Sequence, residues 1–396
     1  MGVSFDAERW RQQPGMAALL EALGAAEGLT RYVGGCVRDE LLGLPFSDLD
    51  LATKLEPLEV VARLEAAGIK AVPTGIDHGT VTAVSSGQVV EVTTLRRDVS
   101  TDGRRATVAF TDDWREDAAR RDFTINALSA DPLTGEIFDY FGGLADIEAR
   151  RVRFIGDPLQ RIAEDHLRIL RFFRFHARFG AGAPNPEALE ACTARANDLM
   201  ALSRERIADE LLKLLALPDP VLTARIMVER QILKPVLPEI EAVDRLAALI
   251  AAESEATVEP HPLRRLASLL PRDPMVAEKV AARLKLSNAA RKRAACIASE
   301  SLDISPKALA YRCGVECAVD RLLLAGEVDA ARSTKDWTPP RLPIGGGALI
   351  QRGLTEGPVV ARTLRRIEDA WVAEGFPSGD RFERIVSAAL AESASS

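Results

Sequence analysis

A chain of 396 residues is too long for one compact core, so we expect more than one domain. Hydrophobic residues make up 47% and charged residues 28%, which excludes wholesale disorder and a fibrous structure. No apolar run reaches the roughly 20 residues that cross a bilayer, and the first residues lack an apolar signal core. We therefore expect a cytoplasmic protein without membrane contact.

The net charge of −7 argues against nucleic-acid binding over the whole surface, because phosphate backbones attract lysine and arginine. One segment of the chain has the opposite sign of charge. Residues 150–180 contain eight arginines against three acids, a local excess of 8 − 3 = +5. An acidic protein with one basic stretch can hold RNA on that surface.

The secondary-structure signals change along the chain. The first ~150 residues mix short β-like runs with helical segments, whereas beyond about residue 155 apolar residues recur at helical spacing and prolines separate the helices. This pattern predicts an α+β fold, with a mixed head over about the first 152 residues followed by an all-helical part. The charged segment 96–113 is predicted to be a mobile loop.

The cysteines are scattered, and only two of them are close in sequence. No third or fourth ligand accompanies that close pair, so we expect reduced cysteines with neither a disulfide nor a metal site. The five are Cys36, Cys192, Cys296, Cys313 and Cys317.

A two-glycine turn follows a strand-like segment near the N-terminus. Thr30 to Val33 is predicted as a strand, Gly34 and Gly35 as the turn, and a helix follows. Because glycine has no Cβ, such a turn lets the backbone approach a triphosphate, and the N–H groups at a helix start favour its negative charge. Arg38 would add a forked contact to phosphate. An ordinary tight turn is the alternative.

Two carboxylates lie on the next predicted strand. Asp48 and Asp50 are two residues apart, so they are expected to project from the same face and to offer hard oxygen ligands for Mg²⁺. An exposed acidic strand end is the alternative. Glu91 alternates with Val90 and Val92 on a further predicted strand, and it is the candidate for a third catalytic carboxylate, with a solvent-facing glutamate as its alternative.

A compact polar cluster occupies residues 120–126. Arg120 and Arg121 can neutralise a triphosphate, while Asp122 and Asn126 can hydrogen-bond a ribose or orient the arginines. An ion-paired helix start is the alternative.

An acid and several arginines are expected on one helix further along the chain. Asp165, Arg168 and Arg171 follow at steps of three, which makes them neighbours on a helix, and Arg174 continues the series. An acid and an arginine held rigidly in this way can present acceptors and donors to the edge of a nucleotide base. A solvated salt-bridge ladder is the alternative.

Taken in order, these segments resemble the class II nucleotidyltransferases, which comprise tRNA CCA-adding enzymes and bacterial poly(A) polymerases. The resemblance is specific over about residues 30–215 and diffuse beyond. It implies a polymerase-β-like nucleotidyltransferase head in residues 1–152, a helical neck with the base-recognition helix in residues 153–240, and a body and tail that bind tRNA in residues 241–396. The matching motifs are Gly34 to Asp39, Asp48 to Asp50, Arg120 to Ala127 and Glu164 to Arg171.

The resemblance also implies roles for individual residues. Asp48 and Asp50 would hold Mg²⁺, and segment 96–113 would correspond to a flexible loop that helps the enzyme switch from C to A. Asp165 and Arg168 would read the base, with Arg171 and Arg174 behind them. The remaining nucleotide contacts would come from Gly34, Gly35, Arg38, Arg120, Arg121, Asp122 and Asn126.

The implied activity is addition of C, C and A to the 3′ end of tRNA from CTP and ATP, without a nucleic-acid template. Poly(A) synthesis, and partial addition of CC or of A alone, are the alternatives within the family. An inactive RNA-binding module is disfavoured because both Asp48 and Asp50 are present. The sequence leaves open whether the protein is a monomer or a homodimer, and which residues of 240–396 contact RNA.

Overall fold

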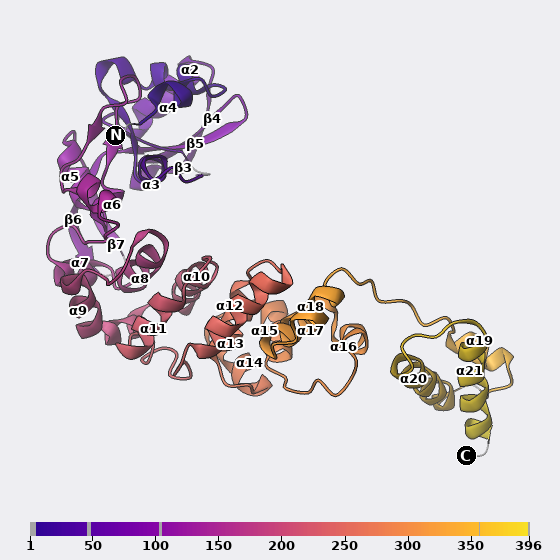
Figure 1. The fold of residues 1–396 in the computed structure, drawn as a ribbon. Coiled ribbons are helices and arrows are strands. Elements are labelled where there is room, and N and C mark those ends of the chain that lie inside the picture. Colours follow the sequence, from indigo (N-terminus) through magenta and orange to yellow (C-terminus); the bar gives the residue numbers. More distant parts are fainter. Residues whose placement is uncertain (1–4, 46–48, 103–104, 356, 395–396) are drawn as a thin grey trace. The chain divides into compact units, whose positions relative to one another are not determined.

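The computed structural model describes residues 5–45, 49–102, 105–355 and 357–394, which form two compact units (Figure 1). Unit 1 comprises Met1–Ser203 and Arg230–Val236, and unit 2 comprises Arg204–Glu229 and Leu237–Ser396. This division by packing does not follow the predicted boundaries at residues 152 and 240. The functional division into head, neck and body therefore stays a prediction.

Unit 1 is built around a seven-stranded mixed sheet with the order β3-β4-β5-β2-β1-β8-β9. Strands β2 and β5 are parallel, and the other described pairings of this sheet are antiparallel. The mixed sheet confirms the predicted α+β class. Its strands are β1 (Thr30–Val33), β2 (Asp50–Thr53), β3 (Lys70–Gly75), β4 (Thr80–Ser85), β5 (Gln88–Thr94), β8 (Ser129–Ala130) and β9 (Ile137–Phe138).

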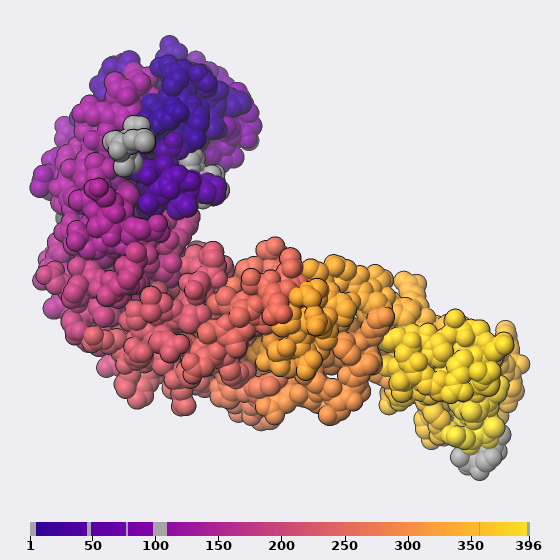
Figure 2. Space-filling view, viewed as in Figure 1, coloured from indigo at the N-terminus to yellow at the C-terminus, as the bar shows by residue number. Residues whose placement is uncertain are grey.

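Alternating side chains give the sheet its buried face. On β5, Val90 and Val92 are buried while Val89 and Glu91 are exposed, as expected for a strand with one covered face. Helix α4 (Pro57–Ala66) packs on β3 and β4 and contributes the fully buried Leu64. In the space-filling view, indigo residues of the N-terminal segment lie directly beside magenta residues from the later part of unit 1 (Figure 2), as the β1–β8 pairing requires.

Segment 96–113, predicted to be a mobile loop, instead contains an antiparallel hairpin. Strand β6 (Arg96–Asp102) pairs with β7 (Arg105–Phe110), and the register shifts between Asp98 and Ser100. A two-stranded ladder is held by backbone hydrogen bonds and needs no alternating apolar residues, which is why the prediction from composition was wrong.

Helix α8 (Arg168–Phe179) is fixed in unit 1 by an aromatic cluster. The ring of Phe123 lies 5.0 Å from that of Phe154 and 5.1 Å from that of Phe175, and Phe154 stacks on Phe172 at 5.7 Å. Such ring pairs add stabilisation beyond the area they bury. The other helices of unit 1 are α1 (Ala7–Arg11), α2 (Met16–Ala22), α3 (Gly35–Leu41), α5 (Trp114–Ala119), α6 (Gly143–Glu148), α7 (Pro158–Glu164) and α9 (Pro186–Ala194).

The described part of unit 2 is helical, as the spacing of apolar residues predicted. Proline occupies the first turn of several of these helices, where its missing N–H leaves no intrahelical bond unmade. The helices are α10 (Arg204–Leu215), α11 (Val221–Glu229), α12 (Asp244–Ala256), α13 (Pro262–Leu269), α14 (Pro274–Arg283), α15 (Asn288–Ile297), α16 (Pro306–Cys313), α17 (Val315–Leu324), α18 (Val328–Thr334), α19 (Gly346–Gln351), α20 (Pro358–Ala373) and α21 (Gly379–Ala394).

A buried ion network joins the helices of unit 2. Arg264 pairs with Glu253 at 2.7 Å and with Asp320 at 2.6 Å, linking α13 to α12 and α17. Arg265 pairs with Glu253 at 2.8 Å and donates to the Leu215 carbonyl at 2.9 Å, at the end of α10. All of these charged side chains are buried, and a buried charge that lost its oppositely charged partner would strongly destabilise the fold.

Two further expectations concern the state of the cysteines and the absence of a membrane-spanning segment. Cys296 and Cys317 form a disulfide, so the prediction of five reduced cysteines was wrong; Cys36, Cys192 and Cys313 are free. The bonded pair is 21 residues apart and is brought together by packing of α15 on α17, which sequence proximity does not reveal. Among the described residues, no helix combines the length and apolarity that a bilayer crossing requires.

Candidate active site

The two-glycine turn connects β1 to α3, as predicted. Gly34 has φ 73° and ψ −125°, a conformation that residues with a side chain rarely adopt. A Cβ at Gly34 would lie 2.8 Å from Nη1 of Arg121, so the guanidinium of that arginine lies directly against the turn. The structure thus brings together two motifs that are almost 90 residues apart in sequence.

Asp50 and Glu91 lie side by side on the parallel strands β2 and β5. The register pairs Asp50 with Glu91, so both side chains project from the same face of the sheet. Glu91 is exposed and Asp50 is partly buried. Asp48 lies outside the described residues, and β2 begins only at Asp50. The candidate third carboxylate is therefore adjacent to one of the two predicted metal ligands.

These neighbouring carboxylates fit a divalent metal by their chemistry. Carboxylate oxygens are the ligands that hard divalent cations prefer, and two on one face repel each other unless a cation lies between them. The residues that would hold the ion are Asp50 and the predicted ligand Asp48, with Glu91 beside them.

The arginine pair is positioned by a buried acid on α5. The carboxylate of Asp117 accepts from Nε of Arg120 at 2.8 Å and from Nη2 of Arg121 at 3.4 Å. Burial raises the pKa of Asp117, but the two arginines outweigh it and hold the pKa below its usual value. Arg121 also donates to the Asn126 carbonyl at 3.3 Å. Asp117 was not among the predicted site residues.

Asp122 and Asn126 form the centre of a second network. The carboxylate of Asp122 accepts from the Asn126 amide at 2.9 Å and from Nε of Arg171 at 2.7 Å. The Asn126 side-chain oxygen in turn accepts from Arg38. Asp122 and Asn126 therefore connect α3 to α8 and orient arginines from both helices.

Arg38, which was predicted to make a forked contact to phosphate, is only 6% exposed. Its Nε donates to Asp39 at 2.7 Å, and its guanidinium lies 4.1 Å from the centre of the Phe179 ring. Burial lowers the pKa of Arg38, and the neighbouring Asp39 opposes that shift. Direct contact of Arg38 with a nucleotide stays a prediction.

The two residues predicted to read the base do not lie on one continuous helix. Helix α7 ends at Glu164, Asp165 has an extended backbone with φ −152° and ψ 107°, and α8 begins at Arg168. The expectation that Asp165 and Arg168 are neighbours on one helix is therefore wrong. The Asp165 carboxylate accepts from the Leu167 N–H at 3.1 Å, which is the local hydrogen bond that an aspartate favours at such a break.

Arg168 makes hydrogen bonds to the backbone of the arginine pair and to residues of α7. Its Nη1 donates to the Arg161 carbonyl at 2.8 Å and pairs with Glu164, and its Nη2 donates to the Arg120 carbonyl at 3.3 Å. Arg161 also donates to the carbonyls of Arg120 and Arg121, at 2.6 and 2.5 Å. Two cations thus lie at the C-terminal end of α5, where the helix dipole favours positive charge.

Arg161 was missed by sequence reasoning. The signal that could have identified it is its spacing of three residues to Glu164 within α7, with which Nη1 of Arg161 pairs at 2.6 Å. Two further arginines of α8 also contact residues of unit 1. Arg171 pairs with Asp122 at 2.6 Å, and the Arg174 guanidinium lies 4.7 Å from the centre of the Phe175 ring.

The basic stretch of residues 150–180 is partly neutralised by acids from elsewhere in unit 1. Arg151 and Arg153 pair with the buried Asp146 at 2.6 and 3.0 Å. Arg178 pairs with Asp39 at 3.3 Å, across 139 residues of sequence. The local excess of +5 therefore overstates the charge that this surface offers to RNA.

A mixed sheet with adjacent carboxylates, next to a glycine turn lined by arginine, has the parts of a nucleotidyltransferase site: ligands for a divalent metal and cations for a triphosphate. Comparisons with known proteins agree with this class. Residues 30–153 match the model of the poly A polymerase head domain, and residues 183–243 match the probable RNA- and SrmB-binding site of polymerase A.

Full-length relatives define the family. The CCA tRNA nucleotidyltransferase 1, mitochondrial, of Mus musculus is 33% identical over 391 residues, covering 91% of this chain and 87% of the relative. The CCA-adding enzyme of Latilactobacillus sakei is 31% identical, covering 91% and 94%. The structure of the Bacillus stearothermophilus CCA-adding enzyme in complex with CTP superimposes with a TM-score of 0.76 at 26% identity, covering 97% and 100%. The chain belongs to the family of tRNA nucleotidyltransferases that contains the CCA-adding enzymes and the poly(A) polymerases.

Substitution of Gly34 tests the contact between the glycine turn and Arg121. In Gly34→Ala the new Cβ would displace the arginine guanidinium, so we expect the affinity for nucleotide triphosphate to fall at least tenfold, or about 1.4 kcal/mol. Isothermal titration with ATP measures this change.

Gly68→Ala is the matched control. Gly68 also has positive φ, at 70°, but a Cβ there would meet nothing within 4 Å. Its substitution also puts a side chain at a residue with positive φ but does not touch Arg121, so ATP affinity should be unchanged. Equal affinity in the two variants would contradict the proposed position of Arg121 at the phosphates.

Proposed function

We propose that this protein adds C, C and A to the 3′ end of tRNA, taking CTP and ATP as substrates and no nucleic-acid template. The observation that carries the proposal is the extent of the similarity: relatives named as a CCA tRNA nucleotidyltransferase and a CCA-adding enzyme match 91% of the chain. The arrangement of side chains in unit 1 supports the same chemistry.

The reaction is an in-line attack on a nucleotide. The oxygen of the RNA 3′-hydroxyl forms a bond to the α-phosphorus while the bond from that phosphorus to its bridging oxygen breaks, and pyrophosphate leaves. A Mg²⁺ ion held by Asp48 and Asp50 would lower the pKa of the attacking hydroxyl, whose proton passes to solvent, and would neutralise charge on the triphosphate. No side-chain base is required, and Glu91 is adjacent to Asp50 as the proposed third carboxylate.

Cationic side chains around the glycine turn hold the triphosphate. Arg121 lies against Gly34, and Arg120 shares the Asp117 carboxylate with it, so both guanidinium groups are preorganised near the turn. A site whose donors are already in place needs little reorganisation when charge develops on the phosphates. Gly35 contributes backbone that a phosphate can approach.

Asp165 and Arg168 read the base in this proposal, and the protein itself acts as template. Arg168 donates to the Arg120 carbonyl, and this contact supports a base-reading role next to the proposed phosphate-binding pair. Arg171 is held by Asp122, so it backs the site from the next turn of α8. A site built to hydrogen-bond one base rejects another strongly, because the wrong base leaves buried donors unpaired.

Unit 2 and part of unit 1 would provide the tRNA-binding surface. The probable RNA-binding model covers residues 183–243, which supports RNA contact by α9, α10 and α11. A cytoplasmic location and a monomeric or homodimeric state stay predictions; the mouse relative is named as mitochondrial.

Incubation with tRNA that lacks its 3′ CCA tests the proposed activity. With CTP and ATP together we expect addition of three nucleotides ending in A, because the protein template accepts C twice before it accepts A. Denaturing gel electrophoresis of labelled tRNA resolves the products. A long ladder from ATP alone would refute CCA addition in favour of poly(A) synthesis, and a stop after two C residues would indicate a partial enzyme.

Asp50→Ala should abolish incorporation in the same assay, while ATP binding without metal should be retained. The exposed Glu65, on α4, provides the control, and Glu65→Ala should leave incorporation unchanged. Activity retained in Asp50→Ala would mean that the metal site lies elsewhere.

Arg168→Ala tests base reading separately from chemistry. The variant loses a forked donor to the base, so we expect discrimination of CTP and ATP against UTP and GTP to fall at least tenfold, or about 1.4 kcal/mol. The ratio of kcat/KM values for each nucleotide measures it.

Arg195→Ala is the control for loss of one arginine charge in the same unit. Arg195 pairs with Asp198 at 2.6 Å, outside the network around Arg120. Its substitution should leave discrimination unchanged. An Arg168→Ala variant that incorporates more slowly but with unaltered nucleotide choice would count against a base-reading role.

A further inference from the structure

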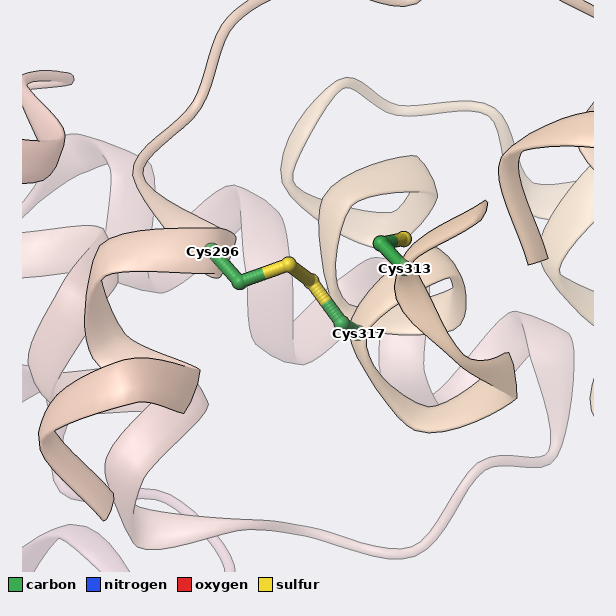
Figure 3. Close-up of side chains that lie close together, drawn as sticks. All are labelled: Cys296, Cys313 and Cys317. Atoms are coloured by element: carbon green, nitrogen blue, oxygen red, sulfur yellow. A yellow bond between two sulfur atoms is a disulfide. The ribbon is translucent and has the colours of Figure 1, made fainter. Parts of the chain in front are cut away.

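Three cysteines of unit 2 converge at one point, and none of them belongs to the candidate site of unit 1. Cys296 lies on α15, Cys313 ends α16, and Cys317 lies on α17; Figure 3 shows the disulfide between Cys296 and Cys317 with Cys313 beside it. The three sulfur atoms all lie within 4.8 Å of one another. The third sulfur is what distinguishes this cluster from a simple structural disulfide.

The chain brings Cys313 and Cys317 together through a glycine break. Helix α16 ends at Cys313, Gly314 has φ 87° and ψ 149°, and α17 begins at Val315. The two cysteines therefore approach the same point from consecutive helices, and α15, which carries Cys296, also packs on α17. The thiol of Cys313 donates to the Leu309 carbonyl at 3.2 Å, so its rotamer is defined.

The cluster is accessible from solvent. A cavity of about 760 Å³ is lined by all three cysteines, together with His261, Arg293 and other residues of α15 and α17. Cys296 and Cys313 are partly exposed and Cys317 is buried. An ion entering this cavity would reach the three sulfur atoms from one side, and the cavity leaves room for a fourth ligand from solvent.

We propose that Cys296, Cys313 and Cys317, once the disulfide is reduced, bind one thiophilic divalent metal ion such as Zn²⁺. A zinc–sulfur bond of about 2.3 Å in a tetrahedral site separates the sulfur atoms by roughly 3.8 Å. Sulfur atoms that already lie within 4.8 Å of one another reach this spacing by small side-chain movements. Thiolate ligands select soft ions such as Zn²⁺ over Mg²⁺, so this site does not compete for the metal of unit 1.

Reduction and metal binding are separate, balanced steps. A dithiol reductant transfers two electrons and two protons to the Cys296–Cys317 bond, giving two thiols while the reductant closes into its own disulfide. Metal binding then displaces the thiol protons to solvent. The disulfide and the metal use the same sulfur atoms, so the two states exclude each other. Either state would cross-link α15 to α17.

Titration of the intact protein with Cd²⁺ tests the proposal, because sulfur-to-metal charge-transfer absorption reports thiolate ligation and ignores carboxylate sites. The protein is reduced with a dithiol, freed of reductant under anaerobic conditions and titrated. We expect the absorption to saturate at one equivalent per chain in the reduced protein, and to be absent in the oxidised protein. No absorption in the reduced protein would overturn the proposal.

Cys313→Ser tests the third ligand. A serine hydroxyl preserves the hydrogen bond to Leu309 but is a poor ligand for a soft ion, so we expect the affinity for Cd²⁺ to fall at least tenfold. Cys192→Ser is the control, because Cys192 is a free, buried cysteine of unit 1. It should titrate like the unaltered protein. Unchanged affinity in Cys313→Ser would overturn the three-sulfur site, and the comparison of reduced with oxidised protein stands even if that variant misfolds.

Discussion

The arrangement of the active-site region depends on the hydrogen bonds and the ion pair made by the buried carboxylate of Asp122. This carboxylate accepts hydrogen bonds from the backbone N–H of Phe123, from Asn126 and from Arg171. The side-chain oxygen of Asn126 in turn accepts a hydrogen bond from Arg38. These contacts join the helix after the glycine turn to the arginine-bearing helix α8. The aromatic rings of Phe123 and Phe175 pack beneath the same residues, at 5.1 Å.

The ionised state of Asp122 is itself set by this network. Burial raises the pKa of Asp122, but Arg171 and the hydrogen bonds from Asn126 and Phe123 outweigh it, so the pKa lies below its usual value. The carboxylate therefore stays charged at neutral pH and continues to hold Arg171. Removing one partner of a buried ion pair typically costs about 3–5 kcal/mol, because the other charge is left without compensation.

The residues that sequence reasoning identified correctly are those with a local signal. Alternation of Val90, Glu91 and Val92 predicted β5, and the turn at Gly34 was recognised from two glycines after a strand. The features that were missed are partnerships across long separations. Packing brings Arg161 to the Arg120 carbonyl, 41 residues away in sequence. Packing also brings together the two cysteines of the disulfide, Cys296 and Cys317.

A second kind of error came from composition. The hairpin β6–β7 is held by backbone hydrogen bonds, so its polar sequence gave no strand pattern. The break at Asp165 was hidden because the residues on both sides of it have strong helical spacing. The Asp165 side chain, which follows the end of α7, accepts a hydrogen bond from the backbone N–H of Leu167. In both cases hydrogen bonds to the backbone, and not the spacing of apolar residues, decided the structure.

A double-mutant cycle between Asp122 and Arg171 measures the central interaction most directly. We would determine the affinity for CTP in Asp122→Asn, in Arg171→Gln and in the double variant. If the pair positions the nucleotide site as one unit, the effects are non-additive by at least about 1 kcal/mol, whereas Asp122→Asn combined with Arg195→Ala is additive within about 0.5 kcal/mol. Additive effects of Asp122→Asn and Arg171→Gln would contradict the account.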